Sequence, residues 1–245
     1  MVVSETGCLA GRAILVTGAG DGLGRAAAKS FAAQGAEVVL LGRTPAKLEG
    51  VYDEIVAAGG PQPAIYPLDL AGATPKEYRD LANTLREEVG HLEGLLHNAA
   101  ILELLTPLDS HPFDVWERTM RANVTGPFVL TQACLPLLTE AADASVIFTG
   151  DECMTKPKGY WGAYGVSKAG VHNMALMLAQ ELSHTHVRVN VVDPGPARTA
   201  MRLRTHPGAP LSSWPLPEDL MGPYVALMRA DSGQSGQVIC VQAGV

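Results

Sequence analysis

The residues best suited to chemistry in this sequence are Tyr164 and Lys168, which lie four positions apart in a helical pattern. Residues at this spacing lie on one face of a helix, so the lysine ammonium can lie beside the phenol. A nearby cation favours the phenolate and lowers the pKa of a tyrosine toward the range that suits general acid–base work. The pair alone is equally typical of an ordinary helix surface, so the other motifs must decide.

A glycine-rich segment near the N-terminus predicts a dinucleotide site. The expected strand Ala13–Thr17 leads directly into it, and a helix follows. Glycines let the backbone approach a pyrophosphate without a Cβ clash, and the helix N-terminus offers free N–H groups. A glycine cluster alone also suits a tight turn, but its place between strand and helix favours dinucleotide binding. We expect the site to include Gly18, Gly20, Asp21, Gly22, Leu23 and Gly24.

The residues after the second expected strand indicate which dinucleotide binds. A carboxylate there would bond to the ribose 2′-hydroxyl, whereas an arginine would pair with a 2′-phosphate. Here Arg43 and Thr44 follow the strand, and both suit a phosphate. NADP(H) is therefore the expected cofactor, with NAD(H) as the alternative and a solvated surface role for Arg43 left open. Asp21 argues against NADP(H), because its charge can approach the same phosphate.

An alternation of short apolar runs and longer helical patterns positions these motifs. Nearly continuous apolar runs are typical of parallel strands buried on both faces. The alternation predicts an α/β protein, a single Rossmann domain over residues 1–245 with a doubly wound parallel seven-stranded sheet and helices on both faces. Strands are expected at Ala13–Thr17, Glu37–Leu41, Ala64–Leu68, Gly94–Asn98, Ser145–Thr149, Val187–Val192 and Val238–Val241. Helices are expected at Gly24–Gln34, Pro45–Ala58, Pro75–Val89, Pro112–Glu140 and Ala163–Ser183.

The least regular stretch, 200–217, contains four prolines and is either a mobile lid or an irregular surface loop. We expect residues 198–217 to form a substrate lid within the domain.

The composition narrows the class of partner. The 25 acidic residues exceed the 18 basic ones and give a formal net charge of −7, which argues against nucleic acid or an anionic membrane. A small-molecule substrate is favoured. The four cysteines form no C-x-x-C pair, no residues cluster as metal ligands, and no apolar stretch is long enough to span a bilayer. The N-terminus has no signal-peptide pattern, so we expect a cytoplasmic protein without a metal site.

Together these motifs make the sequence resemble the short-chain dehydrogenase/reductase family over essentially its whole length. The matching motifs, in the family's order, are Thr17-Gly18-x-x-x-Gly22-x-Gly24, Asp69-Leu70, Asn98-Ala99, Asn123, Tyr164-x-x-x-Lys168 and Pro194-Gly195. The runs Trp161-Gly162-Ala163-Tyr164 and Thr199-Ala200-Met201-Arg202 resemble a bacterial subgroup, the YciK-like oxidoreductases. The resemblance implies an oxidoreductase that uses a nicotinamide dinucleotide.

The resemblance also implies roles for the matching residues. Tyr164 would exchange a proton while the nicotinamide exchanges hydride, Lys168 would also hold the nicotinamide ribose, and Asn123 would hold a water in a proton relay to Lys168. The remaining cofactor site would comprise Asp69 and Asn98 beside the adenine, Thr199 and the backbone near Ala197 beside the carboxamide, and Leu70, Ala99, Pro194 and Gly195. The apolar segments 128–138 and 163–182 resemble the family's subunit interface, which implies a homodimer or homotetramer.

Two residues depart from the family's pattern. His97 replaces the first asparagine of the usual N-N-A-G, and we expect only local packing to change. Thirteen residues before Tyr164, the family generally has a serine that polarises the substrate carbonyl, and this chain has Asp151. An ionised carboxylate cannot donate a hydrogen bond, repels a developing alkoxide, and raises the pKa of a neighbouring tyrosine.

Asp151 leaves two hypotheses about function. Pteridine reductases of the same family carry aspartate at this position, and the run Asp151-x-x-Met154-Thr155 is similar to theirs, although the five residues from Ile101 to Leu105, soon after Asn98, include no aromatic residue to stack a pterin. The leading hypothesis is an NADP(H)-dependent oxidoreductase that reduces a C=O or C=N bond, with Tyr164 as the acid–base group. The alternative is a dinucleotide-binding homologue with impaired catalysis that acts as a sensor or interaction module.

Overall fold

Seven parallel strands form the sheet that carries the site. The computed structural model describes residues 7–242. The strands are β1 (Ala13–Thr17), β2 (Glu37–Gly42), β3 (Ala64–Pro67), β4 (Gly94–His97), β5 (Ala144–Thr149), β6 (Val187–Asp193) and β7 (Val238–Cys240). Their order is β3-β2-β1-β4-β5-β6-β7, and all neighbours are parallel. The connections reverse direction between β1 and β4, the point at which Rossmann sheets bind dinucleotides.

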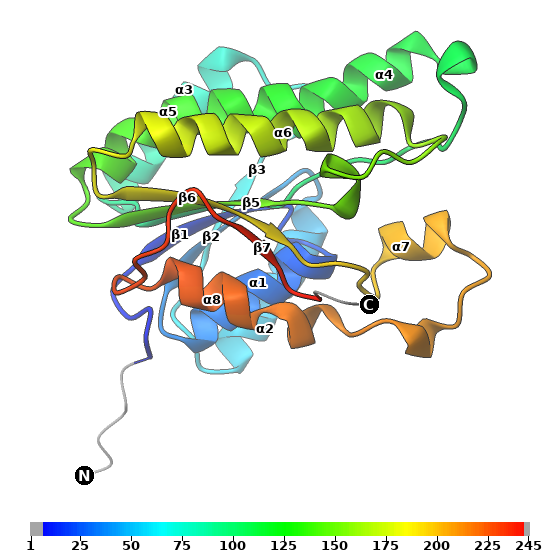
Figure 1. Ribbon diagram of the computed structural model, residues 1–245. Helices are drawn as coiled ribbons and strands as arrows, with labels where there is room; N and C mark the ends of the chain where they lie inside the picture. The colour runs from blue at the N-terminus through cyan, green and yellow to red at the C-terminus, as the bar shows by residue number, and fades with distance from the viewer. Residues whose placement is uncertain (1–6, 243–245) are drawn as a thin grey trace.

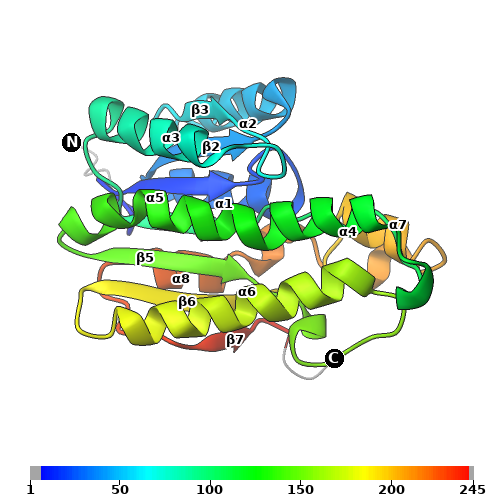
Figure 2. The same ribbon diagram turned by 90° about the horizontal axis from the view of Figure 1, so that it is seen from above.

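Helices cover both faces of the sheet (Figures 1 and 2). One layer holds α3 (Pro75–Glu88), α4 (Phe113–Met120), α5 (Gly126–Glu140) and α6 (Gly162–Glu181), and the other holds α1 (Gly22–Ala33), α2 (Pro45–Ala57) and α8 (Gly222–Met228). A shorter helix, α7 (Ala200–Thr205), lies beyond the carboxyl ends of the strands (Figure 1). Shorter turns are η1 (Leu108–Ser110), η2 (Arg121–Thr125), η3 (Glu152–Met154), η4 (Leu211–Ser213) and η5 (Pro217–Leu220). Within residues 7–242, no helix is long and apolar enough to cross a membrane.

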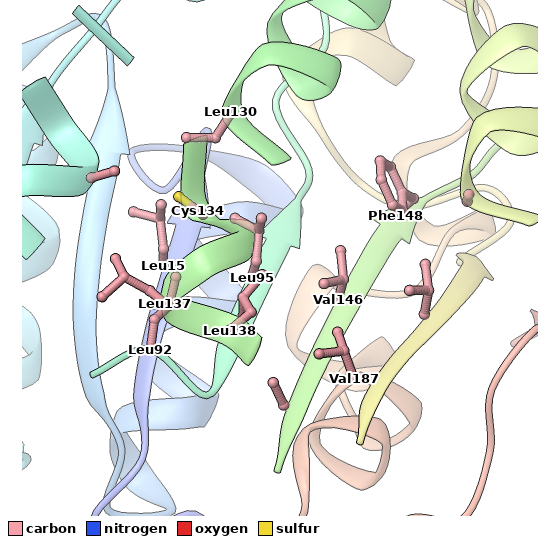
Figure 3. Packing of buried hydrophobic residues seen from close by; sticks show 14 of the residues in the cluster. Leu15, Leu92, Leu95, Leu130, Cys134, Leu137, Leu138, Val146, Phe148 and Val187 are labelled. Carbon is pink, nitrogen blue, oxygen red and sulfur yellow. The ribbon is translucent and has the colours of Figure 1, made fainter. Parts of the chain in front are cut away.

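Successive residues of a strand pack against opposite helix layers. In β1, Leu15 belongs to the core cluster under α3, α5 and α6, whereas Ile14 and Val16 belong to the cluster under α1, α2 and α8. Both faces of the sheet are therefore buried, which explains why the strands are continuous apolar runs. Figure 3 shows the contribution of α5 to the first cluster, with Leu130, Cys134, Leu137 and Leu138 close to Leu15 and Leu95.

The expected strands and helices are present, and most of their ends differ by one or two residues. The helix expected over Pro112–Glu140 is present as one continuous helical segment from α4 to α5, but the π-helical turn η2 within it was not predicted. A π-helical turn holds an extra residue, which an apolar pattern does not reveal. The stretch 200–217, expected to be irregular, contains α7 and η4, and the sequence analysis also missed α8.

His97 ends β4 inside the core. Its ring stacks on Phe148 with centroids 4.5 Å apart, and Nε2 lies 2.8 Å from the Thr131 hydroxyl oxygen. Nδ1 has no hydrogen-bond partner among the described residues. Burial lowers the pKa of His97 to about 3, so the ring is neutral at neutral pH. Replacing the family's asparagine thus adds a buried titratable group in addition to changing the packing.

We expect His97 to make the stability of the fold depend on pH. The unfolded chain takes up the proton near the ordinary histidine pKa of about 6.5, whereas in the folded protein the pKa is about 3. Between these values the unfolded state binds more protons, so the free energy of unfolding falls as pH falls, by up to about 1.4 kcal/mol per pH unit. Urea unfolding at several values between about pH 7 and pH 5 measures the slope. The variant His97→Asn should flatten it by this amount, and an unchanged slope would assign the dependence to other groups.

Candidate active site

The carboxyl ends of the strands open onto one cavity of about 420 Å³. It gathers residues that are up to 187 positions apart in the chain, from Gly18 to Thr205. All of the site residues expected from the sequence line it, except Gly24 and Asn123. Within residues 7–242, no group of three or more histidine, cysteine or acidic side chains is arranged to hold a metal ion.

The glycine loop is packed too closely for side chains. A Cβ at Gly24 would lie 2.2 Å from the Gly18 carbonyl oxygen, and a Cβ at Gly18 would lie 2.9 Å from the Ala99 Cα. Gly18 and Gly22 have φ values of +67° and +50°, which other residues rarely adopt. Gly24 thus packs against the backbone of the loop and does not itself line the cavity. The loop presents its backbone and the start of α1 to the cavity, which fits a pyrophosphate.

The Thr17 hydroxyl joins the carboxyl ends of β1 and β4. It donates to the Leu96 carbonyl oxygen at 3.1 Å and accepts from the backbone N–H groups of Asn98 at 2.9 Å and Ala99 at 3.0 Å. The Asn98 amide donates back to the Thr17 carbonyl oxygen at 3.2 Å. These bonds hold the glycine loop and the Asn98 segment together at the switch point of the sheet.

The rim near α2 carries the groups expected to select the cofactor. Arg43 is exposed, and Thr44 is the N-cap residue of α2 without a side-chain capping bond, so its hydroxyl is available to a ligand. Lys47 also lines the cavity, and its Nζ lies 2.5 Å from Asp21 Oδ2. This pairing lowers the pKa of Asp21 and offsets the charge that argued against a phosphate. Sequence reasoning missed Lys47, although its spacing of four from Arg43 was an available signal.

Tyr164 and Lys168 lie on one face of α6, as their spacing predicts. Lys168 Nζ lies 5.7 Å from the centre of the Tyr164 ring and donates to the Thr149 carbonyl oxygen at 2.8 Å. The Tyr164 hydroxyl donates to Asp151 Oδ2 at 3.1 Å. The other carboxylate oxygen, Oδ1, accepts from the Cys153 backbone N–H at 3.0 Å, which fixes the orientation of Asp151. A carboxylate therefore lies directly beside the phenol.

Burial and negative charge control titration at this end of the cavity. Burial, followed by the charge of Asp151, raises the pKa of Tyr164 well above its ordinary value. Burial lowers the pKa of Lys168, against the opposing effects of Asp151 and Asp193. Burial and Asp151, whose opposing effect the sequence also predicts, therefore outweigh the lowering expected from Lys168. The phenol stays protonated and can act as a proton donor.

Asp193 is an acidic residue of the site that sequence reasoning missed. It ends β6, lines the cavity, and accepts from the Gly195 backbone N–H at 2.9 Å. Burial raises the pKa of its carboxyl group. Its place at the end of a strand, directly before Pro194, was the available signal.

Asn123 lies outside the cavity, in the π-helical turn η2. Its side chain accepts from the Ile101 N–H at 2.8 Å and donates to the Ile101 carbonyl oxygen at 2.9 Å and the Ser167 hydroxyl at 3.0 Å. The amide thus ties η2 to the segment after β4 and to α6. These bonds occupy both of its N–H groups, so the side chain has none left to give to a relay water.

The segment 198–217 borders the cavity above the glycine loop. Thr199 caps α7, and its Oγ1 accepts from the Arg202 backbone N–H at 3.2 Å. A Cβ at Gly22 would lie 3.2 Å from the Thr199 methyl carbon, so the two segments nearly touch. The Arg198 N–H donates to the Pro215 carbonyl oxygen at 2.9 Å and closes the segment into a loop.

Comparison with known protein families matches residues 12–208 to the short chain dehydrogenases. The matched range holds the glycine loop and the Asp151, Tyr164 and Lys168 cluster. The chain belongs to the short-chain dehydrogenase/reductase family. It is therefore an oxidoreductase of that family, with the single Rossmann domain that the sequence predicted.

Individual members of the family match nearly the whole chain. The oxidoreductase YciK of Escherichia coli (strain K12) is 39% identical over 234 residues, covering 95% of this chain and 92% of its own. A short chain dehydrogenase from Pseudomonas syringae is 45% identical, with a TM-score of 0.93 over 97% of this chain and 98% of its own. One from Shigella flexneri 2a, solved in complex with NADP, is 38% identical, with a TM-score of 0.94 over 97% of this chain and 100% of its own. The resemblance to the YciK-like subgroup is confirmed.

We expect Thr17→Val to destabilise the protein, because the Asn98 and Ala99 N–H groups lose their acceptor. A buried donor without a partner costs about 1–3 kcal/mol. Thr17→Ser keeps the hydroxyl and serves as the control, with a smaller loss from the missing methyl group. Urea unfolding of the three proteins measures the difference. Equal losses in both variants would assign the effect to packing of the methyl group.

Proposed function

We propose that this protein is an NADP(H)-dependent reductase of a C=O or C=N bond in a small molecule, with Tyr164 as the proton donor. The observation that carries the proposal is the bond from the Tyr164 hydroxyl to Asp151 at 3.1 Å, beside Lys168 and within the dinucleotide cavity. Bound NADPH would supply the hydride to the carbon of the double bond. Tyr164 would give its proton to the oxygen or nitrogen, and solvent would restore that proton.

The choice of NADP(H) rests on the rim of the cavity. Arg43 and Thr44 offer a positive charge and a hydroxyl at the place where a 2′-phosphate would lie, and Lys47 offsets the charge of Asp21 beside them. The glycine loop fits the pyrophosphate, and the relative from Shigella flexneri was solved with NADP. The rest of the expected cofactor site lines the same cavity, namely Asp69, Leu70, Asn98, Ala99, Pro194, Gly195, Ala197 and Thr199.

Asp151 favours a C=N bond as the reducible group. Reduction of a ketone builds negative charge on oxygen, which a neighbouring carboxylate repels. Once Tyr164 has protonated its nitrogen, a C=N bond is positively charged and accepts hydride to give a neutral amine, so a carboxylate attracts the reactive form. The buried Asp193 adds to this negative environment. The same two carboxylates support the second candidate, a dinucleotide-binding sensor that reduces ketones poorly.

Residues 198–217 would act as the substrate lid, because α7 and its flanks supply a wall of the cavity. A homo-oligomer would form through α5 and α6, which lie in the same helix layer on one face of the sheet (Figures 1 and 2). Phe128 of α5 is 52% exposed and Met177 of α6 is 56% exposed. Exposed apolar side chains on a helix layer are typical of a surface that a partner covers.

The proposed reaction is tested by following NADPH oxidation with imines, pterins, ketones and quinones. For an accepted substrate, we expect Tyr164→Phe to lower turnover by about 100-fold or more while the Kd for NADPH hardly changes. Lys168→Ala should lower turnover and also weaken NADPH binding, since it removes a ribose contact as well as a buried charge. If no substrate is reduced although NADPH binds, the sensor becomes the better description. Full activity of Tyr164→Phe would exclude Tyr164 as the proton donor.

The rim of the cavity predicts which of the two cofactors binds more tightly. NADP(H) should bind more tightly than NAD(H), and Arg43→Ala should reduce this preference by about 1.5–3 kcal/mol, the range for hydrogen bonds to charged groups. Fluorescence titration with both cofactors measures it. The exposed Arg79 of α3 lies outside the cavity, so Arg79→Ala is the matched control for loss of charge. Equal Kd values for both cofactors in the parent protein would contradict the prediction.

The rate of the proposed reduction should depend on pH. Tyr164 donates only when protonated, so reduction proceeds below its pKa and is lost as pH rises through that value. Because the charge of Asp151 raises the pKa of Tyr164, both Asp151→Ser and Asp151→Asn should move the alkaline limb of kcat/KM to lower pH. Asp151→Ser should also gain activity on ketones and lose it on C=N substrates. A parent that reduces ketones efficiently, with an unaltered rate and pH profile in Asp151→Ser, would make Asp151 a bystander.

A further inference from the structure

An aromatic wall leads from Tyr164 to the loop after α7. The ring centroids of Tyr164 and Trp161 are 5.6 Å apart, those of Trp161 and His206 are 6.4 Å apart, and those of His206 and Trp214 are 6.3 Å apart. Leu102 packs in one apolar cluster with the first two of these rings. Of these side chains, Tyr164, Trp161 and Leu102 line the cavity, and a lining of this kind suits the apolar part of a small ligand.

Arg202 of α7 lines the cavity and stacks on the far end of this wall. Its guanidinium carbon lies 5.1 Å from the centre of the Trp214 ring. No carboxylate of residues 7–242 forms an ion pair with it, and its Nε is buried without a hydrogen-bond partner among them. The contact with the indole holds the guanidinium in the lining of the cavity. A partly buried guanidinium without an ion pair suits an anionic ligand.

The neighbouring charges assign Arg202 to the substrate end of the cavity. Burial lowers the pKa of Arg202, and the carboxylates that oppose this effect are those of Asp151 and Glu152, beside the phenol. Glu152 is already paired with Lys158, with 2.6 Å between Oε2 and Nζ. Arg204 lines the same cavity and is exposed, again without an ion pair among the described residues. Arg202 and Arg204 thus supply positive charge that the protein itself does not neutralise.

We propose that the substrate is an organic anion, a small apolar or aromatic molecule whose carboxylate or phosphate binds Arg202 while its apolar part lies along Trp161. The inference rests on the proposed function, because Tyr164 defines the end at which the reducible bond lies. An oxyanion can accept from the Nη groups of Arg202, whose paired N–H bonds suit a carboxylate or a phosphate. Repulsion by Asp151 and Asp193 keeps the anionic group away from the reacting end, which sets the direction of the substrate.

Binding of three probes to the NADP⁺-loaded protein tests the proposal without any turnover. Benzoate and phenyl phosphate are anionic, and benzamide is a neutral molecule of nearly the same shape as benzoate. Calorimetry, or quenching of the fluorescence of Trp161 and Trp214, gives each Kd. We expect at least one anion to bind about 10-fold or more tightly than benzamide, the least that a hydrogen bond to a charged group contributes. The preferred anion identifies whether the group is a carboxylate or a phosphate.

Two variants assign the site. Arg202→Met keeps an unbranched apolar side chain but removes the charge, and it should weaken anion binding by about 10- to 100-fold while leaving benzamide unaffected. Arg79→Met removes a positive charge from the exposed surface of α3 and should change neither anion binding nor benzamide binding. If the enzyme is active, 4-formylbenzoate should be reduced with a higher kcat/KM than its methyl ester, and Arg202→Met should remove the difference.

The proposal is overturned if neither anion binds, if benzoate and benzamide bind equally, or if Arg202→Met keeps full anion affinity. Anion binding through Arg202 without reduction of any C=O or C=N bond would support the anion site and reject the reductase. Reduction of neutral substrates without anion binding would support the reductase and reject the anion site.

Discussion

Parallel strands bring all their carboxyl ends to one edge of the sheet, and this constraint assembles the site. The strand interiors are apolar and buried on both faces, so polar chemistry is confined to the residues that follow each strand. The Thr17 hydroxyl fixes the end of β1 relative to the end of β4, because it forms hydrogen bonds with three backbone groups there. From that junction, the glycine loop, Asn98, Asp151 and Asp193 all face one cavity.

Within the cavity, a balance between burial and charge decides what Tyr164 can do. Lys168 donates a hydrogen bond to the Thr149 carbonyl oxygen, whereas Asp151 accepts directly from the phenol. Both the low dielectric and the carboxylate favour the protonated phenol. A serine at position 151 would remove the negative charge and offer a donor instead. One side chain therefore shifts the site from stabilising an alkoxide toward stabilising a cationic C=N group.

The sequence could predict what depends on local pattern. Strands, helix faces, the glycine loop and the Tyr164/Lys168 spacing follow from periodicity and from residue types at fixed offsets. What it could not predict depends on tertiary contacts. Lys47 reaches Asp21 across 26 positions, and burial adds to the rise in the Tyr164 pKa that Asp151 was expected to cause. The extra residue of the turn that holds Asn123 leaves no trace in the apolar pattern.

The least periodic part of the chain joins the two halves of the cavity. Thr199 nearly touches Gly22 of the glycine loop, and its hydroxyl accepts from the backbone N–H of Arg202. The group nearest the expected cofactor and the group facing the substrate end are thus adjacent in one capping interaction. Arg202 also contacts the Trp214 ring, so the first turn of α7 connects the segment beside the glycine loop with the substrate end of the cavity.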